Sequence, residues 1–405
     1  MEASPHLEIL RPAFRENYGD IEPTHLVQAP GRVNLMGDHI DYNGLSVLPV
    51  ALRRHVAIIL RPRADATVRI ASTDPRYSPR SFDLASAIEP YPDGDWGNYV
   101  KAAGQALARL HGDLKGFDAV VHSDIPVAAG LSSSSALVVA SDLAVLHTND
   151  VWFGKMELAE LLAEAEHYVG TRGGGMDQAI CLAARRHSAS RIYFGPLRLT
   201  AHPIPPEWHF IVAFSLVPAE KSGSLREIYN ARTRECRDAF RAVVQALDAA
   251  DHIDSYSALL SDYATGQLLD VAGGALQGDP LKRFRHVLTE AERVAQAEKT
   301  LVAYDSREFG RLMTESHTSL RDDFEVSIPE LDELVDLSIK AGALGARLTG
   351  AGLGGCVVVL STDRRSDRVM RSLAKNYYAK REFDGSLEDC LFVVEASAGA
   401  SVVGV

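Results

Sequence analysis

Four short segments of this 405-residue chain gather residues of the kinds that bind phosphate or move protons. The first, Pro126 to Leu137, reads PVAAGLSSSSAL, so that a glycine and four consecutive serines open an apolar helical pattern. A helix start offers unpaired backbone N–H groups and a positive dipole end, Gly130 allows close approach of the main chain, and serine hydroxyls add donors or metal ligands. A simple helix cap needs one serine where four are present, so the segment predicts a phosphate site.

The second segment, Ala29 to Pro49, reads APGRVNLMGDHIDYNGLSVLP and places an arginine, two aspartates and a histidine within ten positions. Carboxylates accept hydrogen bonds from sugar hydroxyls, and a guanidinium neutralises charge on a transferring phosphoryl group. The same residues also suit a polar hairpin in which Asp41 caps the turn at Asn43-Gly44 and Arg32 forms a surface ion pair. Taken alone, this segment leaves a polyol site and a polar hairpin equally open.

The third segment, Gly170 to Gln178, reads GTRGGGMDQ, and its three consecutive glycines precede Asp177. Glycine permits backbone conformations that would bring the carboxylate against a bound hydroxyl as a general base. Without further context, a plain loop with Asp177 capping the next helix explains these residues better.

The fourth segment, Leu348 to Val358, reads LTGAGLGGCVV and contains a formal G-x-G-x-x-G match at Gly350, Gly352 and Gly355. A dinucleotide fingerprint needs a helix after its glycines, whereas Cys356 to Leu360 is β-branched and typical of a strand. The pattern therefore predicts a turn between two strands that closes over a ligand. A tight hairpin without a ligand is the alternative.

The surrounding elements alternate between strand and helix patterns. Short β-branched runs from Thr24 to Ile70 predict strands and hairpins, and two helices that follow are expected to pack against that sheet. Composition shifts near residue 200, and the chain is too long for one ordinary core, so we expect two domains, residues 1–200 and 201–405. The helices expected from periodicity span residues 132–146, 156–169, 226–250, 283–297 and 329–341, and further strands span residues 208–216, 347–348 and 356–360.

Bulk composition excludes several classes of protein. The formal net charge of −12 would repel nucleic acid and anionic membranes. Four scattered cysteines lack the spacing of a disulfide framework or a zinc site, and no run of 18 apolar residues occurs. The acidic residues and the lack of a continuous apolar stretch near Met1 lead us to expect no signal peptide. We expect a cytoplasmic monomer with reduced thiols whose ligands are small molecules.

The four segments, in this order and at these distances, resemble the GHMP kinase superfamily, and GRVNLMGDHIDYNG is similar to the signature of its galactokinase branch. The resemblance runs from about Ala29 to Val358 and includes WGNY at Trp96 to Tyr99, similar to the adenine-side segment of that family. It implies an α/β (α+β) fold of two domains, with ATP on the serine loop and a sugar in the cleft between the domains. The implied reaction is transfer of the γ-phosphate of ATP to the anomeric hydroxyl of galactose, giving galactose 1-phosphate.

The resemblance also implies roles for individual residues. Arg32 and Asp177 match the catalytic pair, in which the aspartate approaches the sugar hydroxyl and the arginine stabilises the phosphoryl group. The implied sugar contacts are Arg32, Asp38, His39, Asp41, Gly174, Gly175, Asp177 and Tyr229. The implied nucleotide contacts are Trp96, Gly130, Leu131, Ser132, Ser133, Ser134 and Lys221, and Mg²⁺ is expected to bridge the ATP phosphates with Ser134 as a protein ligand.

Two departures from the family pattern bear on these roles. The first sugar-binding position is usually glutamate, and here it is the shorter Asp38, whose reach is reduced by one methylene. Many relatives carry a glutamate in the helix turn after the serine loop, where this chain has Val138 and Val139, so the metal ligands are not defined by the motif.

Two alternatives to a galactose kinase stay open. GDHIDY, GLSSSSAL and GTRGGGMDQ also resemble N-acetylgalactosamine kinase, and a triple glycine beside the sugar would leave room for a 2-acetamido group. Tyr229 favours galactose instead. A catalytically silent sensor that binds ATP and sugar is the third possibility, and the intact pair of Arg32 and Asp177 argues against it.

Overall fold

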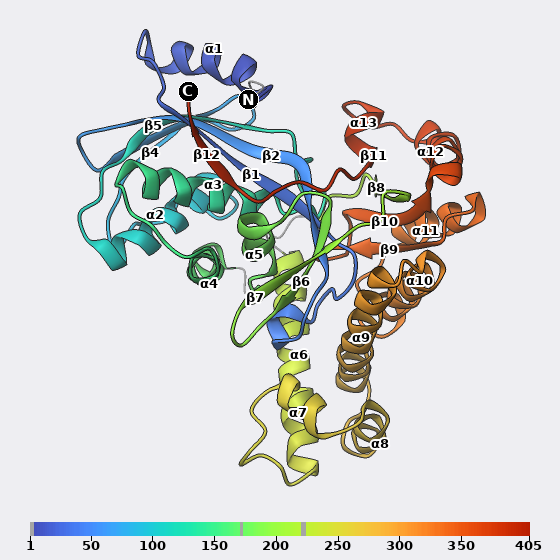
Figure 1. The fold of residues 1–405 in the computed structure, drawn as a ribbon. Coiled ribbons are helices and arrows are strands. Elements are labelled where there is room, and N and C mark those ends of the chain that lie inside the picture. The colour runs from blue at the N-terminus through green and yellow to red at the C-terminus, as the bar shows by residue number, and fades with distance from the viewer. Residues whose placement is uncertain (1–3, 171–172, 220–223) are drawn as a thin grey trace.

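The computed structural model describes residues 4–170, 173–219 and 224–405. Its larger sheet has six strands in the order β12-β1-β2-β5-β3-β4 (Figure 1). Most neighbouring strands are antiparallel, and β3 and β5 are parallel. The strands are β1 (His25–Asn34), β2 (Pro49–Pro62), β3 (Thr67–Ser72), β4 (Arg80–Asp83), β5 (Phe117–Ser123) and β12 (Ser401–Gly404).

Helices cover both faces of this sheet because its strands alternate buried side chains on the two sides. On one face, Leu10 and Phe14 of α1 (His6–Tyr18) pack against Leu26, Ala57 and Ile59. On the other face lies α3 (Ser133–Thr148), which is apolar nearly all round and contacts β1 and β2. Beside α3, α5 (Met176–Ala183) also contacts β1 and β2, and α2 (Gly97–His111) packs on α3. Outside these helices lie α4 (Lys155–Ala165) and the short η2 (Glu166–Val169).

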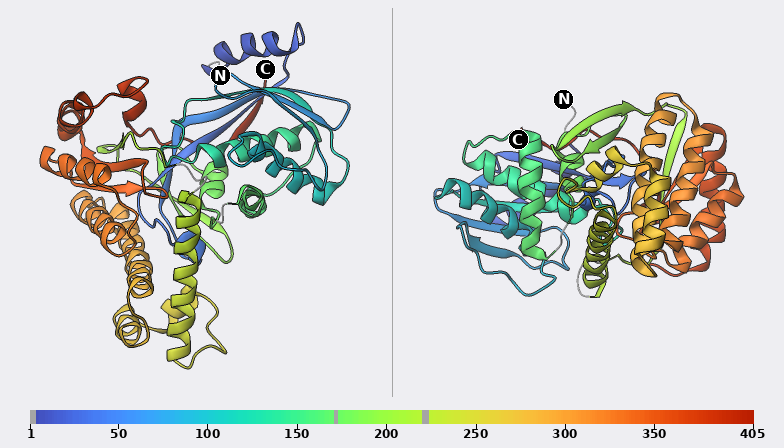
Figure 2. Two further views of the ribbon diagram at one scale, coloured as in Figure 1. Left: turned by 180° about the vertical axis from the view of Figure 1, so that it is seen from behind. Right: turned by 90° about the horizontal axis from the view of Figure 1, so that it is seen from below.

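A second sheet of four strands, in the order β11-β8-β10-β9, lies beside the first (Figures 1 and 2). Its strands are β8 (Trp208–Phe214), β9 (Gly345–Thr349), β10 (Cys356–Thr362) and β11 (Leu391–Val393). The helices α10 (Ser306–Asp322), α11 (Pro329–Ala341) and α12 (Asp363–Asn376) pack on it. A hairpin of β6 (Ser188–Tyr193) and β7 (Arg198–Pro203) meets the segment from Ala29 to Pro49, which we call the sugar-signature segment. The two are joined by a bridge between Val47 and Ile192.

Two long helices, α6 (Ser224–Ala246) and α9 (Asp279–Val302), run side by side and carry α7 (Tyr256–Asp262) and α8 (Thr265–Ala275) at their far end (Figure 1). The other end of α9 packs on α10. The remaining elements are the single turns η1 (Asp41–Asn43), η3 (Tyr378–Lys380) and α13 (Leu387–Cys390). Because α9 reaches from the tip of the molecule to the region between the sheets, its side chains can support residues of both halves.

The C-terminal strand returns to the first sheet, where Leu26 of β1 pairs with Val403 of β12. Residues 401–404 thus lie with the N-terminal half in space, and the division of the chain at residue 200 stays a prediction. Among the described residues, no helix combines the length and the apolar character that crossing a membrane requires.

Most of the local patterns predict elements that the structure contains. The helix predicted at residues 329–341 is α11, and the strands predicted on either side of the fourth glycine segment are β9 and β10. The prediction that both early helices pack against the sheet is correct for α3, whereas α4 packs mainly on α5 and α2. The predicted packing of this helix against the sheet is wrong because α3 already covers that face.

Candidate active site

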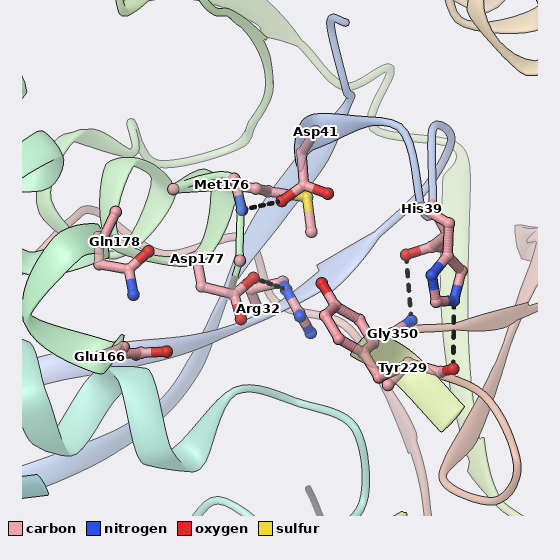
Figure 3. A pocket seen from close by; sticks show the side chains of 15 residues that line it. Arg32, His39, Asp41, Glu166, Met176, Asp177, Gln178, Tyr229 and Gly350 are labelled. Atoms are coloured by element: carbon pink, nitrogen blue, oxygen red, sulfur yellow. Dashed lines mark hydrogen bonds and ion pairs between the residues drawn. The ribbon is translucent and has the colours of Figure 1, made fainter. Parts of the chain in front are cut away.

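Arg32 and Asp177 form a buried ion pair in the pocket of Figure 3. Arg32 Nε donates to Asp177 Oδ1 at 2.7 Å, and the side chains are only 4% and 12% exposed. Asp177 lies in the first turn of α5, where the helix dipole favours a carboxylate. Gly175 caps that helix with a φ of 95°, a left-handed conformation that favours glycine. The two segments that the sequence singled out separately therefore meet.

A bulge in β1 places Arg32 against the serine loop. The pairing of β1 with β2 shifts register between Pro30 and Arg32, so that the Arg32 N–H donates to Leu131 O at 3.0 Å. The Arg32 side chain turns to the same loop and donates from Nη1 to Gly130 O at 2.6 Å. This guanidinium is thereby held by the loop on one side and by Asp177 on the other.

The serines at the start of α3 contact Asp177 on one side and line a cavity on the other. Ser132, in a left-handed conformation with φ of 61°, donates from Oγ to Asp177 Oδ2 at 2.6 Å, and the Ser135 hydroxyl lies 3.5 Å from the same oxygen. Ser133 and Ser134 instead line a large cavity. The loop is therefore built to contact Asp177 with some hydroxyls and a ligand in the cavity with others.

Two cavities meet at Arg32. The larger has a volume of about 740 Å³, and its lining includes Trp96, Tyr99, Gly130 and the serine loop. The smaller has a volume of about 40 Å³ and is lined by Asp41, Gly174, Asp177 and Tyr229 among others. Arg32 and Ala351 line both, so a group bound in one cavity can approach a group bound in the other.

Trp96 lies on the wall of the larger cavity, where the resemblance places the adenine. Its indole Nε1 donates to Ser78 O at 3.1 Å, and its ring lies near that of Tyr77, with centroids 6.2 Å apart. Aromatic faces beside a cavity suit the stacking of a purine base. Lys221, the other nucleotide contact implied by the resemblance, lies outside the described residues.

Asp41 and Tyr229 supply polar groups to the smaller cavity. Asp41 Oδ2 accepts a hydrogen bond from the Gly174 N–H at 3.0 Å, which joins the sugar-signature segment to the third glycine segment. Burial and the charge of Asp177 raise the pKa of Asp41 to about 6. Burial also raises the pKa of Tyr229 well above its ordinary value, so its hydroxyl keeps its proton as a donor.

Asp38 lines the smaller cavity, yet both of its carboxylate oxygens bind protein groups. Oδ2 accepts from Arg347 Nη2 at 2.5 Å, and Oδ1 accepts from the Gly350 N–H at 3.2 Å. The side chain is 2% exposed. In this chain the shorter aspartate thus anchors the 347–351 turn, an arrangement that the motif alone does not reveal.

His39 also lines the cavity with its ring nitrogens engaged. Nε2 lies 3.1 Å from Ala351 O, and Nδ1 lies 3.1 Å from the Tyr42 hydroxyl. Burial, with the nearby His286, lowers the pKa of His39 to about 3, so the ring is neutral. A carbonyl oxygen only accepts, so Nε2 carries the proton and Nδ1 accepts from Tyr42. His39 thus shapes the cavity wall through its ring, which lies against that of Phe324 with centroids 4.6 Å apart.

A buried charge network behind the cavity holds the Gly37–Asp38 backbone. Glu290 of α9 accepts from the Gly37 N–H at 2.8 Å and from Ser316 Oγ at 2.7 Å, and it pairs with Arg293 at 2.7 Å. Burial alone would raise the pKa of Glu290, but the charges of Arg293 and Arg347 lower it to about 2. His286 of the same helix lies 3.1 Å from Asp38 O. Sequence reasoning missed this network, because no motif surrounds residues of α9.

The glycines of the third segment serve backbone packing. A Cβ at Gly174 would lie 2.3 Å from Asp41 C and 2.4 Å from Tyr42 N, whereas a Cβ at Gly173 would meet no atom within 4 Å. The interpretation of the triple glycine as room for a 2-acetamido group is therefore wrong for Gly174, where the space is filled by main chain.

The glycines of the fourth segment pack on the serine loop in a similar way. A Cβ at Gly350 would lie 2.7 Å from Gly130 O, and Gly130 itself has a left-handed φ of 74°. The turn between β9 and β10 therefore lies directly against the predicted phosphate loop. This contact explains how Ala351 reaches the wall of both cavities.

Glu166 and Gln178 line the smaller cavity and were absent from the sequence prediction. Both are buried, and Glu166 is the first residue of η2, directly after α4, on the wall shared with Asp177. Val138 and Val139 are fully buried in the core, so the helix turn after the serine loop offers no metal ligand. The sequence signal that could have pointed to Glu166 was its place just before the third segment, Gly170 to Gln178.

Comparisons with known proteins agree with this geometry. The family model described as the galactokinase galactose-binding signature matches residues 12–62, and the GHMP kinase N-terminal and C-terminal domains match residues 98–185 and 297–379. A galactokinase of Roseiflexus sp. (strain RS-1) is 38% identical over 373 residues, 91% of each chain. A galactokinase of Chloroflexus aurantiacus is 37% identical over 374 residues, 92% of each chain.

Solved structures give the same result. A galactokinase of Lactococcus lactis complexed with galactose superposes with a TM-score of 0.86 at 28% identity, over 96% of this chain and 98% of that one. A mevalonate kinase of Methanococcus jannaschii has a TM-score of 0.62 at 18% identity, over 92% of this chain and 98% of the other, and shares the fold.

Proposed function

Because the chain belongs to the galactokinase family of GHMP kinases, we propose that it transfers the γ-phosphoryl group of ATP to the anomeric hydroxyl of galactose, giving galactose 1-phosphate and ADP. The single observation that carries this proposal is the position of Asp177. Its carboxylate is held by Arg32 and Ser132 where the two cavities meet.

In the proposed reaction, galactose lies in the smaller cavity with its anomeric hydroxyl at Asp177, and ATP lies in the larger one. The anomeric oxygen forms a bond to the γ-phosphorus, the bond to the β,γ-bridging oxygen breaks, and the hydroxyl proton passes to Asp177. Arg32 stabilises the negative charge on the transferring group while it holds the carboxylate in place. The Arg32 contact to Gly130 O fixes this geometry relative to the phosphate loop.

The remaining polar groups of the smaller cavity orient the sugar in this proposal. Asp41, the Gly175 backbone and the Tyr229 hydroxyl line the cavity and can contact sugar hydroxyls. The Gly174 N–H holds Asp41 in place, and Asp38 and His39 form the wall behind them. Matched donors and acceptors discriminate between sugars more strongly than an apolar wall does. The proposal assigns galactose as the substrate, and N-acetylgalactosamine is a second candidate on the motif resemblance alone.

Mg²⁺ belongs to the proposal as the ion that neutralises charge on the ATP phosphates. The donors at the junction are hydroxyls and carboxylates, the oxygen ligands that Mg²⁺ prefers, together with the waters that it keeps. We assign Ser134 and Glu166 to it, because Ser134 lines the nucleotide cavity and Glu166 lies on the wall shared with Asp177. A two-domain division near residue 200, with the cleft between the halves, is part of the same proposal.

The test is steady-state kinetics with galactose, N-acetylgalactosamine and glucose, read out as ADP release. We expect the highest kcat/KM for galactose. A higher value for N-acetylgalactosamine would correct the substrate, and binding of ATP and galactose without turnover of any sugar would favour a sensor over an enzyme.

A further inference from the structure

Outside the kinase site, two histidines and an aspartate converge from three separate elements. His6 lies at the start of α1, His55 lies within β2, and Asp124 follows the end of β5. One side-chain nitrogen or oxygen of each lies within 4.8 Å of the others. The His6 Nε2 to Asp124 Oδ2 distance is 3.3 Å.

We propose that His6, His55 and Asp124 form a binding site for one divalent transition-metal ion of the zinc type. Two ligands about 2.0–2.1 Å from a tetrahedral Zn²⁺ lie roughly 3.3–3.4 Å apart, which is the spacing of the His6 and Asp124 atoms. The third ligand atom, on the His55 ring, lies within 4.8 Å of the other two. Two imidazoles with one carboxylate suit Zn²⁺ and its neighbours, whereas Mg²⁺ and Ca²⁺ prefer oxygen ligands throughout.

The sheet orients the carboxylate of Asp124. Pairing of β2 with β5 places Val56 opposite Ser123, so the backbone N–H of His55 donates to Asp124 Oδ1. Arg54 holds the backbone of the same residue by donating to Asp124 O at 2.8 Å. With Oδ1 engaged by the main chain, Oδ2 lies toward His6. Hydrogen bonds to the second oxygen of a carboxylate typically orient it as a metal ligand.

His6 has the outer partners that a metal-binding imidazole needs. It is 6% exposed, and its Nδ1 lies 2.9 Å from the Gln28 side-chain amide and 3.2 Å from the Ser4 hydroxyl. With a metal on Nε2, Nδ1 carries the proton and requires an acceptor. The Ser4 hydroxyl accepts it, and so does the Gln28 amide oxygen once the amide is turned over.

A metal here would join α1 to the segment that leads from β5 into the serine loop. Asp124 and the neighbouring His122 also line the larger cavity, so an open coordination position would face that space. His122 is a suitable control, because its ring lies 5.8 Å from that of His6 without belonging to the convergent group.

The test uses untagged full-length protein, stripped with a chelator and dialysed against Zn²⁺. We expect one Zn²⁺ per chain and a thermal midpoint raised by a few degrees, because an ion that binds the folded state stabilises it. His6→Ala and Asp124→Asn should weaken Zn²⁺ binding by at least about 100-fold, and His122→Ala should leave it within threefold. The four cysteines are buried, so they do not compete for the ion in the folded protein.

Cobalt substitution of the wild-type protein provides a second measurement that needs no variant to fold. Four-coordinate Co²⁺ on two imidazoles and a carboxylate absorbs visible light strongly, and the band should vanish on addition of Zn²⁺. Less than about 0.1 Zn²⁺ bound per chain, no cobalt band, or binding that the His6 and Asp124 variants leave unchanged would overturn the proposal. These readouts do not depend on kinase activity, so they stand apart from the test of the proposed function.

Discussion

Substitution of Gly174 by alanine tests how tightly the third glycine segment positions the sugar cavity. An added Cβ would lie 2.3 Å from Asp41 C, 2.4 Å from Tyr42 N and 2.6 Å from Asp41 O. All three are backbone atoms, so no side-chain rotation relieves the overlap. The neighbouring Gly173 has open space at its Cβ position, and neither glycine has the left-handed φ that would by itself disfavour alanine.

The magnitude follows from the size of the overlap. Ordinary contacts to a Cβ begin near 3.4 Å, so the Asp41 backbone and residue 174 must separate by about 1 Å. Such a shift breaks the hydrogen bond from the Gly174 N–H to Asp41 Oδ2 and displaces the main chain that leads to Asp177. Misplacement of about 1 Å at a reacting centre costs roughly 100-fold in rate, and overpacking costs about 1–3 kcal/mol of stability.

The assay is steady-state kinetics of both alanine variants with galactose and ATP each varied, together with urea unfolding. We expect kcat/KM for galactose to fall about 100-fold in Gly174→Ala, with KM for ATP within about threefold, because the nucleotide cavity does not include this segment. Gly173→Ala should stay within about twofold of the wild type in every constant. Equal kinetics for the two variants would refute the packing argument.

Three further perturbations test other parts of the site. Asp177→Asn should lower kcat by several orders of magnitude while ATP binding, measured calorimetrically, stays within about threefold, and wild-type kcat would remove Asp177 from the mechanism. The pKa of Asp41 is raised from 3.8 to about 6, so at pH 5 the folded state keeps a proton that the unfolded chain has released. The contribution of Asp41 to stability is therefore complete below about pH 4 and is lost as the pH rises through 6. Relative to Asp41→Asn, the wild type should therefore lose on the order of 2–3 kcal/mol of unfolding free energy between pH 4 and 7, and parallel pH profiles would contradict the assignment. Glu290→Gln should cost about 3–5 kcal/mol of unfolding free energy and raise KM for galactose more than KM for ATP, because it leaves Arg293 without its ion-pair partner and the buried Arg347 with Asp38 alone. Glu298→Gln on the same helix, whose glutamate pairs with Arg191 and His202 away from the cavity, is the control. Equal losses in both variants would show that Glu290 has no special position.

The local chemistry of the site could be predicted from the sequence because it depends on residue type and short spacing. Glycine before consecutive serines at a helix start marks the segment of Gly130 and Ser132, and strand patterns on either side of Gly350 exclude a dinucleotide fingerprint. Both conclusions rest on backbone geometry within a few residues. The helix of residues 329–341 was predictable for the same reason.

The partners of Asp38 were not predictable in this way. Its carboxylate binds Arg347 and the Gly350 N–H, more than 300 positions away in the chain. The loss of one methylene relative to the family's glutamate is visible in the sequence, but which groups lie within its reach depends on how two sheets meet. Glu290 and Glu166 escaped notice likewise, because each is an ordinary helical glutamate until the fold buries it.

The sequence by itself determined the types of reactive group and the backbone freedom around them: an arginine, an aspartate, a serine-opened helix and glycines where side chains would collide. Only the tertiary structure decided that Arg32 forms its ion pair with Asp177 and that Asp38 forms one with Arg347. It also decided that Glu290 of α9 holds the backbone of the sugar-signature segment. The physical reason is that hydrogen bonds and ion pairs form at about 3 Å between groups brought together by burial of distant apolar surfaces, and no short stretch of sequence encodes that arrangement.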